Sequence, residues 1–118
     1  LSNNNITING GHQTRDFIYV KDVVAIIFKS VILSQSSVVC EQVNVLTGKS
    51  ISIDELATLL IKKINVNVKK EYFALPAGDP KGSLGSTKKL ESFLKIDLND
   101  MISIDKGLSK TVKFITSS

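Results

Sequence analysis

The sequence predicts a small mixed α/β domain built from short strands and about four helices. Its 118 residues suit one domain, and 42% hydrophobic with 22% charged residues is an ordinary globular composition. Short segments of alternating polarity, typical of strands, are separated by longer segments with apolar residues at helical spacing. We therefore expect one packed domain with a modest core rather than a disordered chain.

The first third of the chain suggests a hairpin followed by a helix. Residues 6–8 alternate in polarity and run into the turn sequence of residues 9–11, which contains two glycines. The return strand of the predicted hairpin is residues 14–20. Residues 21–33 are apolar at nearly every position, and their length favours a helix that is buried on more than one side, for example against another domain. A loop is predicted at residues 34–37.

The middle of the chain contains the clearest helix signal. Residues 42–46 read as a strand and residues 47–50 as the turn after it. Ser52 and Glu55 have the spacing of a capping box, in which each side chain binds a backbone amide at the start of a helix. Apolar residues then recur at helical spacing as far as residue 64. Acidic residues in the first turn and lysines in the last also favour this helix.

The last part of the chain predicts one more strand and two helices. Residues 66–73 alternate in polarity and resemble an edge strand, and residues 76–85 form a loop rich in proline and glycine. A short helix is expected over residues 87–94. Ser103 is placed to cap a final helix whose apolar positions are Ile104, Leu108, Val112 and Ile115.

Composition argues against several classes of function. The net charge is +4, but the lysines are scattered and no aromatic residues are interleaved with them, which disfavours nucleic-acid binding. Cys40 and His12 are the only cysteine and histidine, so neither a disulfide framework nor a zinc site is expected. The longest apolar run, residues 23–28, is too short to span a bilayer. We expect a cytoplasmic protein with no membrane partner.

Two residues stand out as candidate ligand-binding groups. Arg15 is the only arginine, and its planar guanidinium can bind a phosphate or carboxylate through two hydrogen bonds; an internal ion pair with Asp16 or Asp22 is the alternative. Asp79 follows a glycine and precedes a proline, so its carboxylate could accept hydrogen bonds from ribose hydroxyls, or simply bind its own turn. The sequence of residues 47–50 lacks the upstream glycine of a phosphate loop. Nothing in the chain indicates a catalytic triad.

Residues 13–24 resemble the Gln-x-Arg-Asp-Phe-x-x-Val-x-Asp segment of the extended short-chain dehydrogenases that act on nucleotide sugars, the NAD-dependent epimerase/dehydratase family. The resemblance continues through residues 43–52, through Gly78, Asp79 and Lys89, and ends at a helix containing Gly107, Leu108 and Thr111. It covers residues 6–115. It implies that the chain is the C-terminal substrate-binding lobe of such an enzyme, over residues 1–118.

The resemblance implies specific roles for several residues. Arg15 would bind the diphosphate of a UDP-sugar, and Asp79 the ribose. Asp16 and Tyr19 belong to the same motif and are further candidate substrate-binding residues, with the alternative that they fix its backbone or pack. The chain departs from the family where Pro76 and its neighbours replace a second phosphate-binding arginine, and where the aspartate of the lysine-containing segment is missing. Lys81 could supply the lost charge.

The same resemblance implies a partner domain. The Rossmann domain that binds NAD, and the Tyr-x-x-x-Lys pair that moves protons, are absent from this sequence. The expected function is therefore nucleotide-sugar binding within a longer NAD-dependent isomerase, a UDP-glucose 4-epimerase-like enzyme whose parent could be a homodimer. The chain alone is not expected to be active. The alternatives are a lobe of a sugar-nucleotide dehydratase or 6-epimerase, or a stand-alone, non-catalytic binding or interaction domain.

Overall fold

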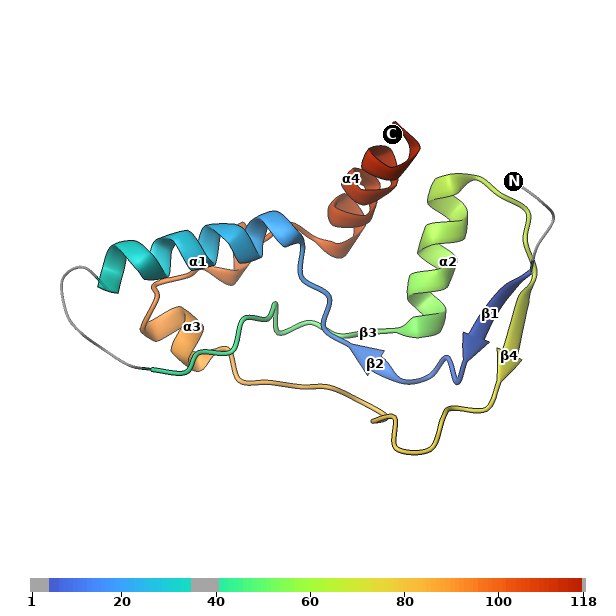
Figure 1. Cartoon of the computed structure of the whole chain (residues 1–118), viewed down its shortest axis with the longest axis horizontal. Coiled ribbons are helices and arrows are strands. Elements are labelled where there is room, and N and C mark those ends of the chain that lie inside the picture. The colour runs from blue at the N-terminus through green and yellow to red at the C-terminus, as the bar shows by residue number, and fades with distance from the viewer. Residues whose placement is uncertain (1–4, 35–40, 118) are drawn as a thin grey trace.

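The chain folds into a mixed α/β lobe, as predicted. The computed structural model describes residues 5–34 and 41–117. In chain order the elements are β1 (Ile6–Asn9), β2 (Thr14–Arg15), α1 (Val20–Ser34), β3 (Ile51–Ser52), α2 (Ile53–Ile64), β4 (Lys70–Phe73), α3 (Lys88–Ser92), the short 3-10 helix η1 (Leu98–Asp100) and α4 (Ile104–Thr116) (Figure 1). Residues 35–37 of the predicted loop, and Cys40, lie outside the described residues.

The predicted hairpin between residues 6–8 and 14–20 is wrong. Strand β1 instead pairs in parallel with β4, from Ile6 opposite Lys70 to Asn9 opposite Phe73. The turn after β1 explains the change of direction. The Gln13 side chain accepts a hydrogen bond from the Gly11 amide (2.6 Å) and donates one to the Asn9 carbonyl (2.6 Å), so the turn is closed by a side chain. The chain then leaves β1 instead of returning along it.

Strand β2 is shorter than predicted and has a different partner. It contains only Thr14 and Arg15, which pair in antiparallel fashion with Ser52 and Ile51 of β3. The predicted strand over residues 42–46 does not form, because a strand needs a neighbouring edge and β2 is paired at residues 51–52 instead. Both two-residue strands are set by contacts between distant segments, which no local pattern reveals.

Helices α2 and α4 begin where the sequence predicts. The Ser52 hydroxyl accepts from the Glu55 amide (3.1 Å) and the Glu55 carboxylate accepts from the Ser52 amide (3.0 Å), so the predicted capping box is confirmed. Ser103 caps α4, as predicted, and α3 confirms the short helix expected over residues 87–94. Strand β4 occupies the second half of the strand predicted over residues 66–73. These elements depend on local signals, which explains why they are predictable.

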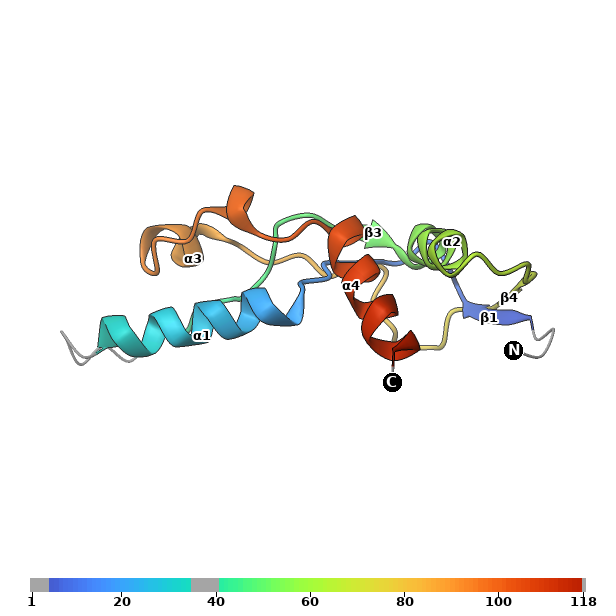
Figure 2. The same ribbon diagram turned by 90° about the horizontal axis from the view of Figure 1, so that it is seen from above.

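The core is small: a cluster of three buried apolar residues lies at one end of the molecule, and among the described residues the only other buried hydrophobic residues, Ile8 of β1 and Ala57 of α2, lie toward the other. In that cluster Ile26 of α1 packs with Leu90 and Leu94, and Leu90 is completely buried. Figures 1 and 2 show α1 and α3 side by side at this end, with α2 beside β1 and β4 at the other. Between them, Lys63 of α2 forms an ion pair with Asp105 of α4 (2.5 Å). The two ends are therefore joined mainly by extended segments and by α4.

The molecule is more open than a compact domain of its length. Its radius of gyration is 17.3 Å, whereas a compact domain of this length has about 13.5 Å. Its accessible surface is 8756 Å², against roughly 6300 Å² expected for its mass. Much of the excess is apolar: Val20, Val24, Ile27 and Phe28 of α1 are between 55% and 66% exposed. Within this chain α1 is thus buried on one side only, by Ile26.

One residue of the fold is placed in an unfavourable backbone conformation, which gives a stability prediction. Lys95, just after α3, has φ 53, in the left-handed region that glycine adopts more easily. We expect Lys95→Gly to raise the free energy of unfolding by about 1 kcal/mol. Asn65 at the end of α2 has a similar φ of 57, but asparagine tolerates this region, so Asn65→Gly should change stability less. Urea unfolding of both variants tests this, and an equal effect would contradict it.

Candidate functional site

Arg15 projects from β2 and is held by three hydrogen bonds. Its Nη1 donates to the carbonyls of Thr14 (2.8 Å) and Pro80 (2.9 Å), and its Nη2 donates to Oδ1 of Asp79 (2.6 Å). These contacts account for three of the five N–H groups of the guanidinium. The side chain is 25% exposed. Arg15 is therefore fixed in position while it retains N–H groups that a ligand can reach.

Asp79 is presented by a tight turn. The Asp79 amide donates to the carbonyl of Pro76 (3.1 Å), and Gly78 has φ 87, as the third residue of a type II turn requires. The Asp79 side chain is 35% exposed. One carboxylate oxygen binds Arg15, which leaves the other for a ligand hydroxyl. The ion pair proposed for Arg15 with Asp16 or Asp22 is thus replaced by one with Asp79, 64 residues away.

A third chain segment ties Arg15 and Asp79 together. On the side of β2 away from β3, the Thr14 amide donates to the Lys81 carbonyl (3.0 Å), and the Ser83 amide donates to the Thr14 carbonyl (3.2 Å). These bonds form a parallel bridge between Thr14 and Gly82. Strand β2 is therefore held between two segments, and the loop that carries Asp79 is anchored two residues after it.

The other two predicted site residues lie against different parts of the chain. The Asp16 carboxylate accepts hydrogen bonds from the Thr47 amide (3.1 Å), the Thr47 hydroxyl (2.6 Å) and the Gly48 amide (2.7 Å). The Tyr19 ring lies against Gly107 of α4, where an added Cβ would be 3.5 Å from it. Of the four candidates, the structure brings Arg15 and Asp79 together and places Asp16 and Tyr19 at separate contacts.

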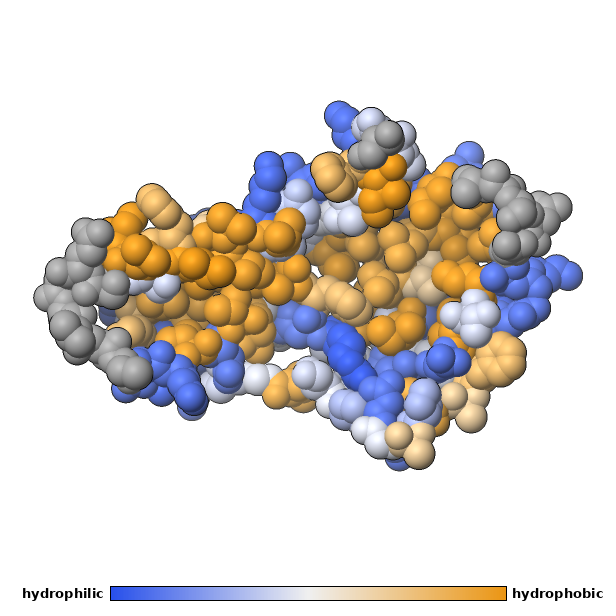
Figure 3. Space-filling model, in the orientation of Figure 1, coloured by the Kyte–Doolittle hydropathy of each residue, from blue (hydrophilic) through white to orange (hydrophobic). Residues whose placement is uncertain are grey.

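The region around β2 is a hydrophilic band between two apolar areas. Figure 3 shows one face of the molecule, with apolar surface over α1 and again around α2 and α4. The hydrophilic band between them lies at the position of β2 in Figure 1. Figure 2 shows α1 and the end of α4 on one side of the molecule, with α3 on the opposite side. A partner that covered the face shown in Figure 3 would enclose the hydrophilic band.

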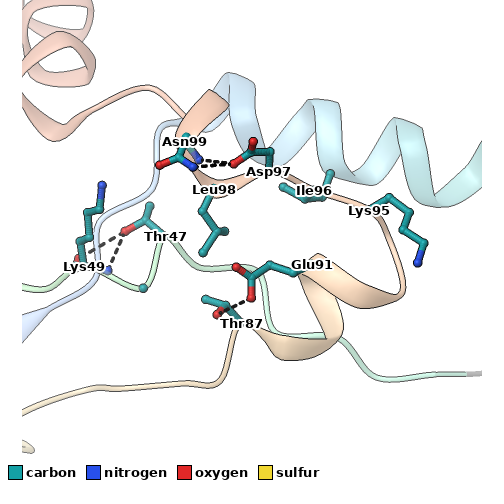
Figure 4. Close-up of a pocket in the computed structure, with 10 residues that line it drawn as sticks. Thr47, Lys49, Thr87, Glu91, Lys95, Ile96, Asp97, Leu98 and Asn99 are labelled. Carbon is teal, nitrogen blue, oxygen red and sulfur yellow. Dashed lines mark hydrogen bonds between the residues drawn. The ribbon is translucent and has the colours of Figure 1, made fainter.

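A separate hollow lies elsewhere on the molecule. It has a volume of about 640 Å³, and Figure 4 shows it between the turn at Thr47 and Lys49 and the segment from α3 to η1. Its polar side chains largely bind one another: Thr87 donates to Glu91 (3.2 Å), and the Asn99 amide donates to Asp97 (3.0 Å). Two lysines and two carboxylates line it, so it carries no net charge to attract a diphosphate. We therefore regard Arg15 and Asp79 as the better candidate site.

Across residues 5–34 and 41–117, no group of three histidine, cysteine, aspartate or glutamate side chains could hold a metal ion. Among the same residues, no helix is long and apolar enough to cross a membrane. Lys89, which was part of the resemblance to the epimerase/dehydratase family, forms an ion pair with the Glu41 carboxylate (2.7 Å). Its ammonium is therefore engaged within the chain.

A charged cluster that the sequence did not reveal joins α2 to β4. The Asp54 carboxylate accepts hydrogen bonds from the Lys70 ammonium (2.7 Å) and from the Tyr72 hydroxyl. The hydrogen bond from Lys70, followed by that from Tyr72, lowers the pKa of Asp54 below its ordinary 3.8. The bond to Asp54 in turn raises the pKa of Lys70. The residues are too far apart in sequence for a local pattern to link them.

This cluster predicts a pH dependence of stability. Because the pKa of Asp54 is lower in the folded state, its contribution is present above pH 3.8 and is lost as the pH falls through the folded pKa. We expect Asp54→Asn to destabilise the protein near neutral pH and to flatten the loss of stability below pH 4. Urea unfolding at several pH values measures this. Asp100→Asn, at an exposed carboxylate, is the control, and equal behaviour of the two variants would contradict the prediction.

Solved structures of nucleotide-sugar epimerases and of a dehydratase are similar in fold to this chain. No protein-family model matches the sequence, and no curated protein sequence matches it significantly. A UDP-N-acetylglucosamine 4-epimerase from Methanobrevibacter ruminantium M1, solved with UDP-N-acetylmuramic acid, is 30% identical with a TM-score of 0.76, over 97% of this chain and 36% of that one. The present chain thus spans about a third of the length of that enzyme.

Two further solved structures share the fold. A UDP-glucuronic acid 4-epimerase from Bacillus cereus, in complex with UDP-glucuronic acid and NAD, has a TM-score of 0.83 at 22% identity, over 98% of this chain and 36% of that one. TunA, an NAD-dependent NDP-hexosamine 5,6-dehydratase of tunicamycin biosynthesis, has a TM-score of 0.83 at 19% identity, over 99% and 37%. These neighbours confirm the fold class predicted from the sequence and the resemblance to NAD-dependent epimerases and dehydratases.

Proposed function

We propose that this chain, whose fold is that of about one third of an NAD-dependent nucleotide-sugar epimerase or dehydratase, is the lobe that binds the nucleotide sugar. The observation that carries the proposal is the ion pair of Arg15 with Asp79 (2.6 Å). Arg15 belongs to β2, which lies at the hydrophilic band. A diphosphate needs positive charge and fixed N–H donors, and a ribose needs a hydroxyl acceptor. The pair offers both within one site.

Each residue has a defined role in this proposal. Arg15 binds the diphosphate through N–H groups left over from its contacts with Thr14, Pro80 and Asp79. Asp79 accepts hydrogen bonds from the ribose through its second carboxylate oxygen. Such contacts hold the sugar in one orientation, and orientation lowers the barrier of the reaction without any bond being made by this lobe. The UDP-sugars bound by the neighbouring enzymes support UDP-hexose as the ligand class.

A second domain is part of the same proposal. The exposed apolar residues Val20, Val24, Ile27 and Phe28 of α1 are too many on one helix face for a solvated surface. The apolar surface over α1 lies beside the hydrophilic band. We propose that a Rossmann domain of a longer protein covers this face and encloses the ligand between the two domains. The sequence contains no glycine-rich dinucleotide loop, so NAD would be bound by that other domain.

The reaction class we favour is 4-epimerisation of a UDP-hexose, because both 4-epimerases described above share the fold over almost the whole chain. Dehydration is the second candidate, supported by the equally similar fold of the dehydratase. The two reactions differ in chemistry at the sugar, which the proposed Rossmann domain would carry out. The residues of this lobe anchor the nucleotide in either case.

A direct assay of the longer protein tests the proposed function. The full-length product of the gene is incubated with a panel of UDP- and dTDP-sugars, and the products are separated by chromatography. We expect conversion of a UDP-hexose to its 4-epimer, and a keto-sugar product would indicate the dehydratase. No conversion of any sugar by a folded protein, together with tight UDP binding by the 118-residue chain alone, would instead support a stand-alone binding domain.

A further inference from the structure

We propose that Asp16 is a positioning residue for Arg15: its carboxylate holds the turn at Thr47 and Gly48 and so fixes the strand pair that presents the guanidinium. This inference rests on the proposed role of Arg15 in binding the nucleotide. Asp16 directly follows Arg15 in the sequence, but in this proposal the Asp16 side chain does not touch the ligand.

Both oxygens of the Asp16 carboxylate are already engaged. Oδ1 accepts from the amide and the hydroxyl of Thr47, at 3.1 and 2.6 Å, and Oδ2 accepts from the Gly48 amide at 2.7 Å. The amides of Thr47 and Gly48 are successive and both point at this carboxylate, which is a known backbone arrangement for holding a negative group. Hydrogen bonds to an ionised acceptor are about twice as strong as neutral ones. A ligand would have to displace them to reach Asp16.

The turn that Asp16 holds leads directly into the partner strand of Arg15. Gly48 lies three residues before Ile51, and Ile51 pairs with Arg15 across the β2–β3 ladder. That ladder has only two residue pairs, which is too short to be stable without further contacts. Asp16 follows Arg15 and binds the segment before Ile51, so its bonds close the ladder at the end where Arg15 lies.

The opposite arrangement, in which Asp16 meets the ligand, conflicts with both geometry and charge. Consecutive residues of an extended strand point to opposite faces, so Asp16 is not expected to share the face of Arg15. A carboxylate beside a diphosphate would also repel it. If Asp16 acted only through its charge, its removal would strengthen nucleotide binding, whereas loss of a positioning contact weakens it.

The test is a calorimetric titration of the full-length protein with UDP. We expect Asp16→Ala to raise the Kd for UDP about tenfold. Asp16→Asn, which keeps one acceptor oxygen, should recover part of the affinity, and Thr47→Val, which removes only the hydroxyl donor, should raise the Kd about twofold to threefold. Hydrogen exchange of the Gly48 amide should be faster in Asp16→Ala. Asp100→Asn is the control for removal of a carboxylate elsewhere and should leave the Kd unchanged.

A double variant separates positioning from direct contact. In the Arg15→Ala background, Asp16→Ala should raise the Kd no further than about twofold, because the group that it positions is gone. A further tenfold loss in that background, or tighter UDP binding by Asp16→Ala itself, would overturn the inference. If Arg15→Ala alone left the Kd unchanged, the proposed nucleotide site would fail instead. Should Asp16→Ala not fold, the same cycle is run with Thr47→Val, and an unchanged Kd there would overturn the inference.

Discussion

Replacing Arg15 by alanine is expected to reduce the affinity of the full-length protein for UDP-hexose by one to two orders of magnitude. Loss of a hydrogen bond to a charged group costs about 1.5–3 kcal/mol, which corresponds to roughly 10-fold to 150-fold in Kd. The effect should be large because Arg15 is the only arginine of the chain. Calorimetric titration with UDP-hexose measures it.

Arg15→Lys is the matched variant. It keeps the positive charge but loses the planar fork, so its affinity should lie between those of the wild type and Arg15→Ala. Lys81→Ala tests whether the lysine two residues after Asp79 adds charge to the site, as the sequence suggests, and should raise the Kd less than Arg15→Ala does. An Arg15→Ala protein that is folded and binds UDP-hexose as tightly as the wild type would exclude the phosphate role.

Introducing a charge on the apolar face of α1 should disrupt the longer protein far more than the lobe itself. Phe28 is 66% exposed in this chain, so Phe28→Glu in the 118-residue chain should change the free energy of unfolding by no more than about 0.5 kcal/mol. If a Rossmann domain covers this face, the same substitution buries an unpaired carboxylate and should cost several kcal/mol in the longer protein.

The comparison is made by urea unfolding of both proteins. Lys110→Glu introduces the same side chain on α4, at an exposed position that is already charged in the wild type, and should have little effect in either. Phe28→Glu should also lower the catalytic activity of the longer protein, because the two domains no longer enclose the ligand. Equal effects of Phe28→Glu and Lys110→Glu in the longer protein would contradict the proposed docking of a second domain on α1.

The elements predicted correctly are those that depend on neighbours in the sequence. The capping box of Ser52 and Glu55, the cap at Ser103 and the helical spacing that follows each contain their own signal. Strand pairing has no such signal. The partner of β1 is β4, more than 60 residues later. The β2–β3 ladder joins two residues of a longer predicted strand, Thr14 and Arg15, to the two residues that follow the predicted turn at 47–50. The hairpin and the strand over residues 42–46 were therefore predicted wrongly.

The candidate site also combines features that the sequence predicted with contacts between distant segments that it did not. Arg15 stood out because no other arginine occurs, and Asp79 because of the glycine before it and the proline after it. Their ion pair could not be predicted, since it depends on the bridge that brings Gly82 beside Thr14. The contacts of Asp16 with Thr47 and Gly48, and the cluster around Asp54, likewise join segments that are distant in sequence. Residue type indicated which groups could bind a ligand, and tertiary structure decided which of them meet.

A crystal structure of the full-length protein with UDP-hexose would show whether this lobe holds the nucleotide at Arg15 and Asp79. We expect the diphosphate to lie within hydrogen-bond distance of the Arg15 guanidinium, a ribose hydroxyl to donate to Asp79, and a second domain to cover α1. Asp16 should keep its bonds to Thr47 and Gly48. A nucleotide bound in the hollow between Lys49 and Lys95, with Arg15 and Asp79 paired only with each other, would contradict the proposed site.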